Sequence, residues 1–159
     1  AHALSRATAR SPWRMELHEL ASGAAIINDA YNANPESMTA ALRTLAAVGD
    51  RRRAANADAR TIAVLGDMLE LGPQSADLHY RIGALAAELG IDEVVAIGQF
   101  AGDLAAGASQ TGGRSRVVQH DQAADSLNLS AGDVVLIKAS RGLGLERVAD
   151  RLLGQEGAQ

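Results

Sequence analysis

The sequence predicts an α/β protein built on an open, mostly parallel six-stranded sheet, with helices on both faces and one antiparallel edge strand. Short β-rich runs alternate with stretches of helical periodicity, as in βαβ units. The later β-rich runs are continuously apolar, which is typical of parallel strands that are covered on both faces. The first run alternates apolar and polar residues, as an antiparallel strand with one buried face does.

Six segments are expected to form strands. In the first, Met15 and Leu17 alternate with polar neighbours, whereas the later segments are rich in Val and Ile. Because helical stretches separate most of these segments, the strands are expected to pair in parallel through crossover connections, in a Rossmann-like arrangement. The expected strands are residues 14–20, 24–29, 61–66, 93–98, 116–119 and 133–138.

Apolar stripes with helical spacing predict three helices. The first stripe runs from Met38 to Val48, and Gly49 is the expected left-handed terminator. The second runs from Leu78 to Leu89 and is followed by Gly90; the third covers 145–153. Two further helices are expected near 100–109 and 121–128, where alanine and glycine blur the period. A flexible surface loop is expected at 107–116.

Composition narrows the class of protein. At 159 residues with 47% hydrophobic content, the chain is expected to form one domain that buries roughly 70% of its unfolded surface. A net charge of -4 argues against nucleic acid as a partner, since phosphate binding needs a basic face. The basic run at 51–53 lies among small polar residues, which favours a solvated loop over a binding patch.

The chain lacks cysteine, so it offers no disulfide framework and no thiolate metal site. Its apolar runs are shorter than the roughly 20 residues of a membrane span, and no signal-peptide pattern opens it, which predicts a cytoplasmic protein without membrane insertion. The opening stretch, "AHALSRATARSPW", is typical of a linker that enters a domain. We therefore expect the chain to be a piece of a longer protein.

In parallel α/β sheets ligands bind beyond the carboxyl ends of the strands, and the first candidate turn there is "IINDAYNANPESM". Asn34 and Pro35 suit the N-cap and first position of a helix. Asp29 is placed where nucleotide-binding sheets hold a ribose, and a helix N-terminus favours a nearby phosphate. The alternative is that Asp29 only ends a strand.

The second candidate turn is "LGDMLELG". Asp67 and Glu70 could meet Mg²⁺ or a substrate ammonium, or they could belong to a loop whose Asp caps itself. His79 lies at the edge of the second apolar stripe, which favours a packed, hydrogen-bonded core residue over a catalyst.

The third candidate turn is "LIKASRGLGLERV". Lys138, Ser140 and Arg141 crowd into a glycine-containing turn that suits a carboxylate or a phosphate. A dinucleotide fingerprint is excluded because Arg147 stands where its last glycine should be. The sequence also has no GxxxxGK(S/T) phosphate loop and no zinc-like spacing, so we expect no metal site in this chain.

Together, "INDAYNANPESM", "VLGDMLELG", "SADLHYRIG" and "VLIKASRGLGLE" resemble the C-terminal domain of the Mur ligase family, from about Trp13 to Leu153. The resemblance implies a domain at 13–154, preceded by a linker at 1–12 from a central ATPase domain and followed by a tail at 155–159. It also implies an ATP-dependent, amide-bond-forming enzyme of peptidoglycan synthesis that adds D-Ala-D-Ala to UDP-MurNAc-tripeptide.

By the same resemblance, ATP and Mg²⁺ are held mainly by the central domain, while this domain closes over the nucleotide and holds the dipeptide. The implied ATP-binding residues are Asp29, Tyr31, Asn32 and Asn34. The implied D-Ala-D-Ala-binding residues are Lys138, Ser140, Arg141, Asp67 and Glu70, and the resemblance assigns no certain catalytic residue to this domain. The stretch "SPWRMEL" departs from the Gly-Arg expected before the first strand, so Arg14 receives no role.

Two alternatives remain open at this point. A stand-alone module could bind a nucleotide or an acidic ligand without chemistry. Among enzymes, the folylpolyglutamate synthases share the architecture, but they would place a histidine before Pro35, where this chain has Asn34. A phosphate-loop segment upstream in the parent gene would favour the ligase over the binding module.

Overall fold

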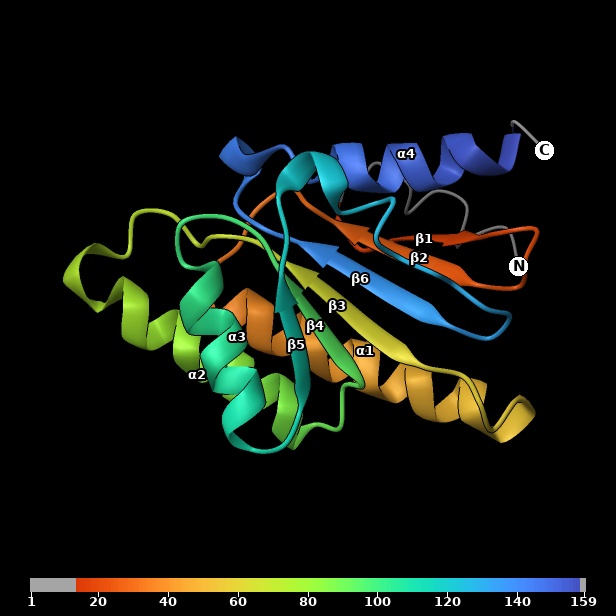
Figure 1. Ribbon diagram of the computed structural model, residues 1–159, viewed down its shortest axis with the longest axis horizontal. Coiled ribbons are helices and arrows are strands. Elements are labelled where there is room, and N and C mark those ends of the chain that lie inside the picture. The colour runs from red at the N-terminus through yellow and green to blue at the C-terminus, as the bar shows by residue number, and fades with distance from the viewer. Residues whose placement is uncertain (1–13, 158–159) are drawn as a thin grey trace, which may run out of the picture.

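The computed structural model describes residues 14–157 and places one mixed sheet between two layers (Figure 1). The sheet has six strands in the order β1-β2-β6-β3-β4-β5, and only the β1–β2 pair is antiparallel. The predicted fold class is therefore confirmed. The strands are β1 (Glu16–Glu19), β2 (Ala25–Asp29), β3 (Thr61–Leu65), β4 (Glu93–Ala96), β5 (Arg114–Val117) and β6 (Val134–Lys138).

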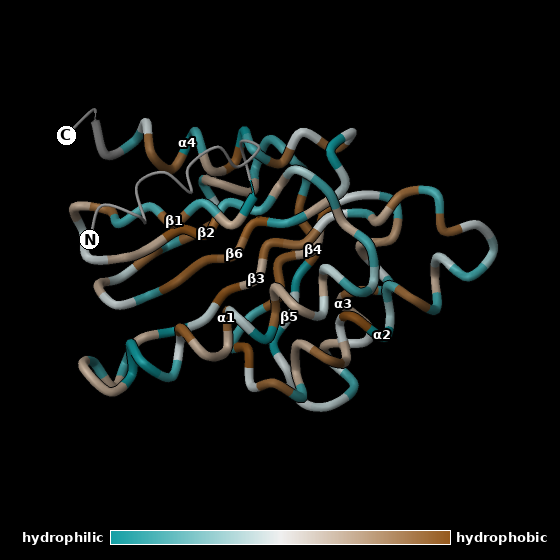
Figure 2. Tube along the Cα trace, turned by 180° about the vertical axis from the view of Figure 1, so that it is seen from behind, coloured by the Kyte–Doolittle hydropathy of each residue, from teal (hydrophilic) through white to brown (hydrophobic). Residues whose placement is uncertain are grey.

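Helices cover both faces of the sheet unequally. One face packs against α1 (Pro35–Ala55), α2 (Ser75–Glu88) and α3 (Ala101–Gln110), and the other packs against α4 (Glu146–Gly157) and the segment at 118–133. Figure 2 shows the central strands as the most hydrophobic part of the trace. Each of β2, β3 and β6 is buried along its whole length, which accounts for the continuously apolar runs in the sequence.

Gly49 does not end the first helix, contrary to the sequence-based expectation. Helix α1 continues to Ala55, and Gly49 is buried where the helix passes so close to Thr61 that a Cβ would overlap the threonine methyl group. The glycine therefore serves close packing, not termination. Gly90, by contrast, follows α2 with a φ of 75°, as a terminator should.

The basic run at 51–53 lies in the last turns of α1, so the predicted solvated loop is wrong. Arg52 donates to the carbonyl oxygens of Gly23 and Gly132 at 2.7 Å each. Arg53 pairs with Asp92 at 2.7 Å. These guanidiniums tie the helix to the loops at the amino ends of the strands, which a local reading of charge could not show.

Two other segments also differ from expectation. The stretch at 121–128 forms only a short 3-10 turn at His120–Gln122 followed by turns, although its Ala123 and Ala124 are buried against the sheet. The predicted loop at 107–116 instead contains the end of α3 and the start of β5. Within the described residues, no helix is long and apolar enough to cross a membrane.

Helices α2 and α3 approach each other through a pair of glycines. A Cβ on Gly107 would overlap the carbonyl oxygen of Tyr80, and a Cβ on Gly83 would overlap that of Leu104. We expect Gly107→Ala to lower the free energy of unfolding of the chain by about 1–3 kcal/mol, because the added methyl group forces two backbones apart. Denaturation with urea would measure this change.

Gly102→Ala is the matched control, since it lies in the same helix with open space around the new Cβ. Its stability should stay unchanged or rise by up to about 1 kcal/mol. Equal stability of the two variants would contradict the close-packing account.

Candidate functional site

The connectivity of the sheet brings three predicted turns together at one edge. Strand β6 is last in the chain but lies between β2 and β3, and its Lys138 is in register with both Asp29 and Leu65. The chain therefore leaves the sheet at three adjacent carboxyl ends. Residues 29–34, 66–72 and 138–144 meet at this switch point, where open α/β sheets bind their ligands.

A buried ion pair holds the first turn. The Lys138 ammonium donates to Asp29 Oδ2 at 2.7 Å and to the Asn32 carbonyl oxygen at 2.8 Å. The other carboxylate oxygen, Asp29 Oδ1, accepts from the Met15 N–H at 3.1 Å. The Lys138 side chain is only 3% exposed, so its charge depends on this carboxylate for compensation.

The second turn is held by a carboxylate that binds backbone amides. Asp67 is buried and accepts from the N–H groups of Gln99 and Phe100, both at 2.9 Å. Gly98 allows this approach, since a Cβ there would lie 2.6 Å from Asp67 Oδ2. Asp67 therefore stabilises the neighbouring 98–100 loop, which differs from the predicted alternative of a loop whose Asp caps itself.

His79 fixes the next amide of the same turn. Its ring is fully buried and stacks on Phe100 with a centroid distance of 4.5 Å. Nε2 lies 2.8 Å from the Met68 N–H, and Nδ1 lies 2.6 Å from the Ser75 carbonyl oxygen. Since one neighbour is a donor and the other an acceptor, the imidazole is neutral with its proton on Nδ1. The prediction of a packed core histidine is confirmed.

Ser140 links the two turns across the end of β6. Its N–H donates to the Asp67 carbonyl oxygen at 2.9 Å, and its Oγ accepts from the Leu69 N–H at 2.9 Å. The same Oγ lies 3.4 Å from the carbonyl oxygen of Ala33, to which it donates. The hydroxyl therefore holds the positions of both turns relative to each other.

The exposed part of the edge is centred on an aromatic ring. Tyr31 is half-buried, with the Arg14 guanidinium 3.9 Å and the Arg141 guanidinium 5.4 Å from its ring centroid. Such contacts hold cations over the ring face. Asn32, in the first turn, and Glu70, in the second turn, are also exposed. The edge thus presents two cations, one carboxylate and carboxamides above a rigid base.

Asn34 caps α1, as expected. Its Oδ1 accepts from the Ser37 N–H at 2.8 Å, and Ser37 Oγ accepts from the Asn34 N–H at 3.0 Å. This reciprocal pair orients the start of the helix, with Pro35 in its first turn. The Asn34 side-chain amide group remains exposed toward the same edge of the molecule.

The structure thus divides the predicted site residues by burial. Asp29, Lys138, Asp67 and Ser140 are buried, while Asn32, Asn34, Glu70 and Arg141 are exposed. Sequence reasoning assigned no role to Arg14. Its place follows from the observed antiparallel pairing of β1 with β2. With Glu16 opposite Asn28, the residues just before β1 lie beside those that follow β2.

At the opposite edge of the sheet, where the strands begin, Arg60 and Asp133 form a structural ion pair. Burial raises the pKa of Asp133, but hydrogen bonds from the Arg60 guanidinium and from the N–H groups of Ser130 and Arg60 outweigh it and hold that pKa below its usual value. The Arg60 pKa is raised, chiefly by the hydrogen bond to Asp133. This pair closes the loop before β6 onto the loop before β3.

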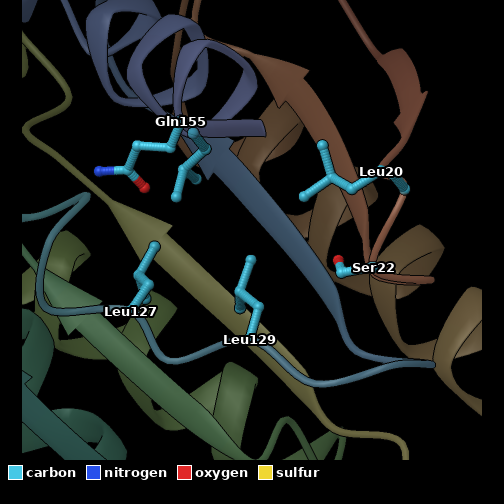
Figure 3. A pocket seen from close by; sticks show the side chains of 7 residues that line it. Leu20, Ser22, Leu127, Leu129 and Gln155 are labelled. Atoms are coloured by element: carbon cyan, nitrogen blue, oxygen red, sulfur yellow. The ribbon is translucent and has the colours of Figure 1, made fainter. Parts of the chain in front are cut away.

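A cavity of about 520 Å³ also lies toward this opposite edge, between the β1–β2 turn and the end of α4 (Figure 3). Its lining is mainly leucine, from Leu20, Leu127, Leu129 and Leu152. It shares no residue with the three turns. Among the side chains that the structure describes, residues 14–155, no group of three or more His, Cys, Asp or Glu could hold a metal ion.

The fold and the site first define the class of protein. It is an open α/β domain in which three polar turns follow the carboxyl ends of β2, β3 and β6, and β6, the last strand in the sequence, lies between the other two. The family described as "Mur ligase, glutamate ligase domain" matches residues 13–141, and the chain belongs to that family.

Two curated relatives carry the same name. The UDP-N-acetylmuramoyl-tripeptide–D-alanyl-D-alanine ligase of Mycobacterium leprae is 40% identical over 154 residues, and that of Bacillus subtilis is 37% identical over 145 residues. The alignments cover 89% and 88% of this chain, respectively. The chain spans only 30% of the length of each relative.

Solved structures agree on the fold. A crystal structure of MurF from Acinetobacter baumannii superposes with a TM-score of 0.73 at 28% identity and covers 91% of this chain and 31% of that one. A structure of MurF from Thermotoga maritima in complex with ADP gives a TM-score of 0.67 at 24% identity, over 94% of this chain and 32% of that one. At that lower identity the likeness concerns the fold alone.

The Asp29–Lys138 pair yields a stability prediction. Asp29→Asn leaves a buried ammonium without an anionic partner, which should lower the free energy of unfolding by about 3–5 kcal/mol. The double variant Asp29→Asn/Lys138→Met removes both charges and should recover most of that loss. Urea denaturation of the two variants and the parent would measure it.

Asp77→Asn is the control, because its pair with Arg81 is exposed on α2 and should change stability by about 0.5 kcal/mol or less. A double variant no more stable than Asp29→Asn alone would show that the stability loss has another cause.

Proposed function

We propose that this chain is the C-terminal domain of an ATP-dependent ligase that joins D-Ala-D-Ala to UDP-MurNAc-tripeptide in peptidoglycan synthesis. The observation that carries the proposal is the 40% identity to a relative of that name across most of the chain, together with its family membership. In this proposal residues 13–154 form the domain, after a linker at 1–12. A stand-alone binding module is less well supported, because both relatives described above are ligases.

On the nucleotide side, the proposal assigns ATP to Asp29, Tyr31, Asn32 and Asn34. The Asp29 carboxylate is compatible with a ribose, because it has about four lone-pair sites and the Lys138 and Met15 contacts occupy only part of them. The first turn of α1 begins beside it, so helix N–H groups favour a phosphate there. Asn32 and Asn34 are exposed toward the same ligand.

On the acceptor side, the proposal assigns the dipeptide to Lys138, Ser140, Arg141, Asp67 and Glu70. Arg141 is exposed and can bind a carboxylate through two parallel N–H groups. Lys138 uses two of its three N–H groups within the protein, which leaves one for a ligand. Asp67 and Ser140 support this part of the edge by fixing its turns.

The remaining parts of the reaction belong to the rest of the enzyme in this proposal. The central domain would hold Mg²⁺ and provide most of the contacts to ATP, and the N-terminal domain would hold the UDP-sugar. This domain closes over them and aligns the dipeptide with the activated peptide, where alignment of reactants can be worth roughly 7–11 kcal/mol. Because the reaction uses ATP and a nucleotide-linked precursor, we place the enzyme in the cytoplasm.

The ATP assignment is best tested with the double variant Asp29→Asn/Lys138→Met in the full-length enzyme, because a single Asp29 change would also unbalance Lys138. Losing a hydrogen-bond pair to a charged group should raise KM for ATP roughly 10- to 150-fold. KM for UDP-MurNAc-tripeptide should stay nearly unchanged. Steady-state phosphate release would measure both constants, and an unaltered KM for ATP would reduce Asp29 to a structural partner of Lys138.

The dipeptide assignment is tested by Arg141→Lys, which keeps the charge but removes the planar fork. We expect KM for D-Ala-D-Ala to rise about tenfold, the equivalent of one charge-assisted hydrogen bond. Arg43→Lys on the exposed surface of α1 serves as the control and should leave every constant unchanged. An effect of Arg141→Lys confined to ATP would assign the 138–144 turn to the nucleotide.

A further inference from the structure

Backbone strain is concentrated at the candidate edge. Within residues 14–157, the non-glycine residues with positive φ are Met15 at 46° and Glu70 at 64°. Met15 donates its N–H to Asp29, and Glu70 lies in the turn that follows β3. The left-handed conformation is unfavourable for a residue that has a Cβ, and it persists only where the surrounding structure imposes it.

The structure around Glu70 does impose it. The preceding residues are fixed one by one: Asp67 by two amides, Met68 by His79 and Leu69 by Ser140. After Leu71, a 3-10 turn begins at Gly72 and leads directly into α2. Leu69 and Glu70 therefore form a short tip, held at both ends, which cannot relax by moving its neighbours.

What the tip presents is unusual for a tight turn. Leu69 is 45% exposed, although it is a large apolar residue, and Glu70 is also exposed. Leu69 Cδ1 lies 3.3 Å from the position that a Cβ on Gly142 would take, so the leucine borders the turn that carries Arg141. A carboxylate, an apolar side chain and a guanidinium thus occur along one stretch of the edge.

We propose that the Leu69–Glu70 tip selects the acceptor substrate as a small zwitterionic dipeptide. Glu70 binds its ammonium, Leu69 packs against its side-chain methyl groups, and Arg141 binds its carboxylate. The series of groups on the protein matches the series on such a ligand. This inference rests on the proposed function and deepens it, since it names the residues that distinguish D-Ala-D-Ala from other amines.

The strain gives a test that does not depend on activity. Glu70→Gly removes the Cβ that disfavours a φ of 64° and should raise the thermal midpoint of the chain, or at least leave it unchanged. Glu70→Gln keeps the Cβ and should leave the midpoint unchanged. A clear fall in the midpoint of Glu70→Gly would overturn the claim that this position is strained.

In the full-length enzyme, Glu70→Gln and Glu70→Gly should each raise KM for D-Ala-D-Ala about tenfold, with KM for ATP and for UDP-MurNAc-tripeptide unchanged. The stabilised Glu70→Gly variant would then be the less active one, which a purely structural role does not predict. Glu88→Gln, an exposed carboxylate on α2, is the matched control.

Leu69→Ala tests the apolar contact by comparing D-Ala-D-Ala with glycylglycine, which lacks the methyl groups. The preference for D-Ala-D-Ala in kcat/KM should fall about fourfold, the equivalent of one buried methyl group. Val117→Ala, an exposed apolar residue on β5, should not change this preference.

The outcomes separate this inference from the proposed function. If Arg141→Lys raises KM for the dipeptide while the Glu70 and Leu69 variants behave like the parent enzyme, the tip is not the selectivity element, but the ligase assignment stands. If the parent enzyme releases no phosphate in response to D-Ala-D-Ala, the proposed function itself fails.

Discussion

The arrangement of the candidate site depends on the buried pair between Lys138 and Asp29. Lys138 is the last residue of β6, a central strand of the sheet, and Asp29 is the last residue of the neighbouring strand β2. A buried ammonium without a partner is strongly destabilising, so the pair constrains both strand ends at once. The second bond from Lys138 to the Asn32 carbonyl oxygen extends the constraint into the turn that leads to α1. The half-buried Tyr31 and the exposed Asn32 and Asn34 owe their positions to this contact and to the helix cap.

The sequence predicted the sheet well because its signals are local. Continuous apolar runs marked the parallel strands within a few residues of their observed bounds, and Asn34-Pro35 marked the start of α1. The errors arose where contacts with distant parts of the chain determine the local structure. Gly49 lies in a helix interior, where Thr61 packs against it. Arg52 and Arg53 extend α1 because their partners lie in remote loops. The insertion of β6 between β2 and β3 also follows from no local pattern.

The candidate residues could be found from sequence because strand ends collect ligand-binding side chains, but their division of labour could not. Asp67 and Glu70 looked equivalent, as two carboxylates in one turn. In the structure the Asp67 carboxylate accepts hydrogen bonds from the N–H groups of Gln99 and Phe100, whereas Glu70 is exposed. Likewise, Lys138 and Arg141 looked like a pair of cations, yet only Arg141 has its charged group at the surface. Burial, which requires the fold, separates the groups that are bound mainly within the protein from those that lie at the surface of the edge.

That separation has a physical consequence for how the domain can act. The Lys138 ammonium and the Ser140 hydroxyl bind groups of other turns, and Asp67 binds the amides of the neighbouring 99–100 loop, so hydrogen bonds connect the three turns before any ligand arrives. A rigid site loses little conformational freedom on binding, and its dipoles need no reorganisation when charge develops nearby. The exposed side chains at this edge include Arg14 and Arg141, near the Tyr31 ring, and Glu70 on its left-handed backbone. The orientation of the polar groups at this edge is therefore set by the contacts of the domain itself.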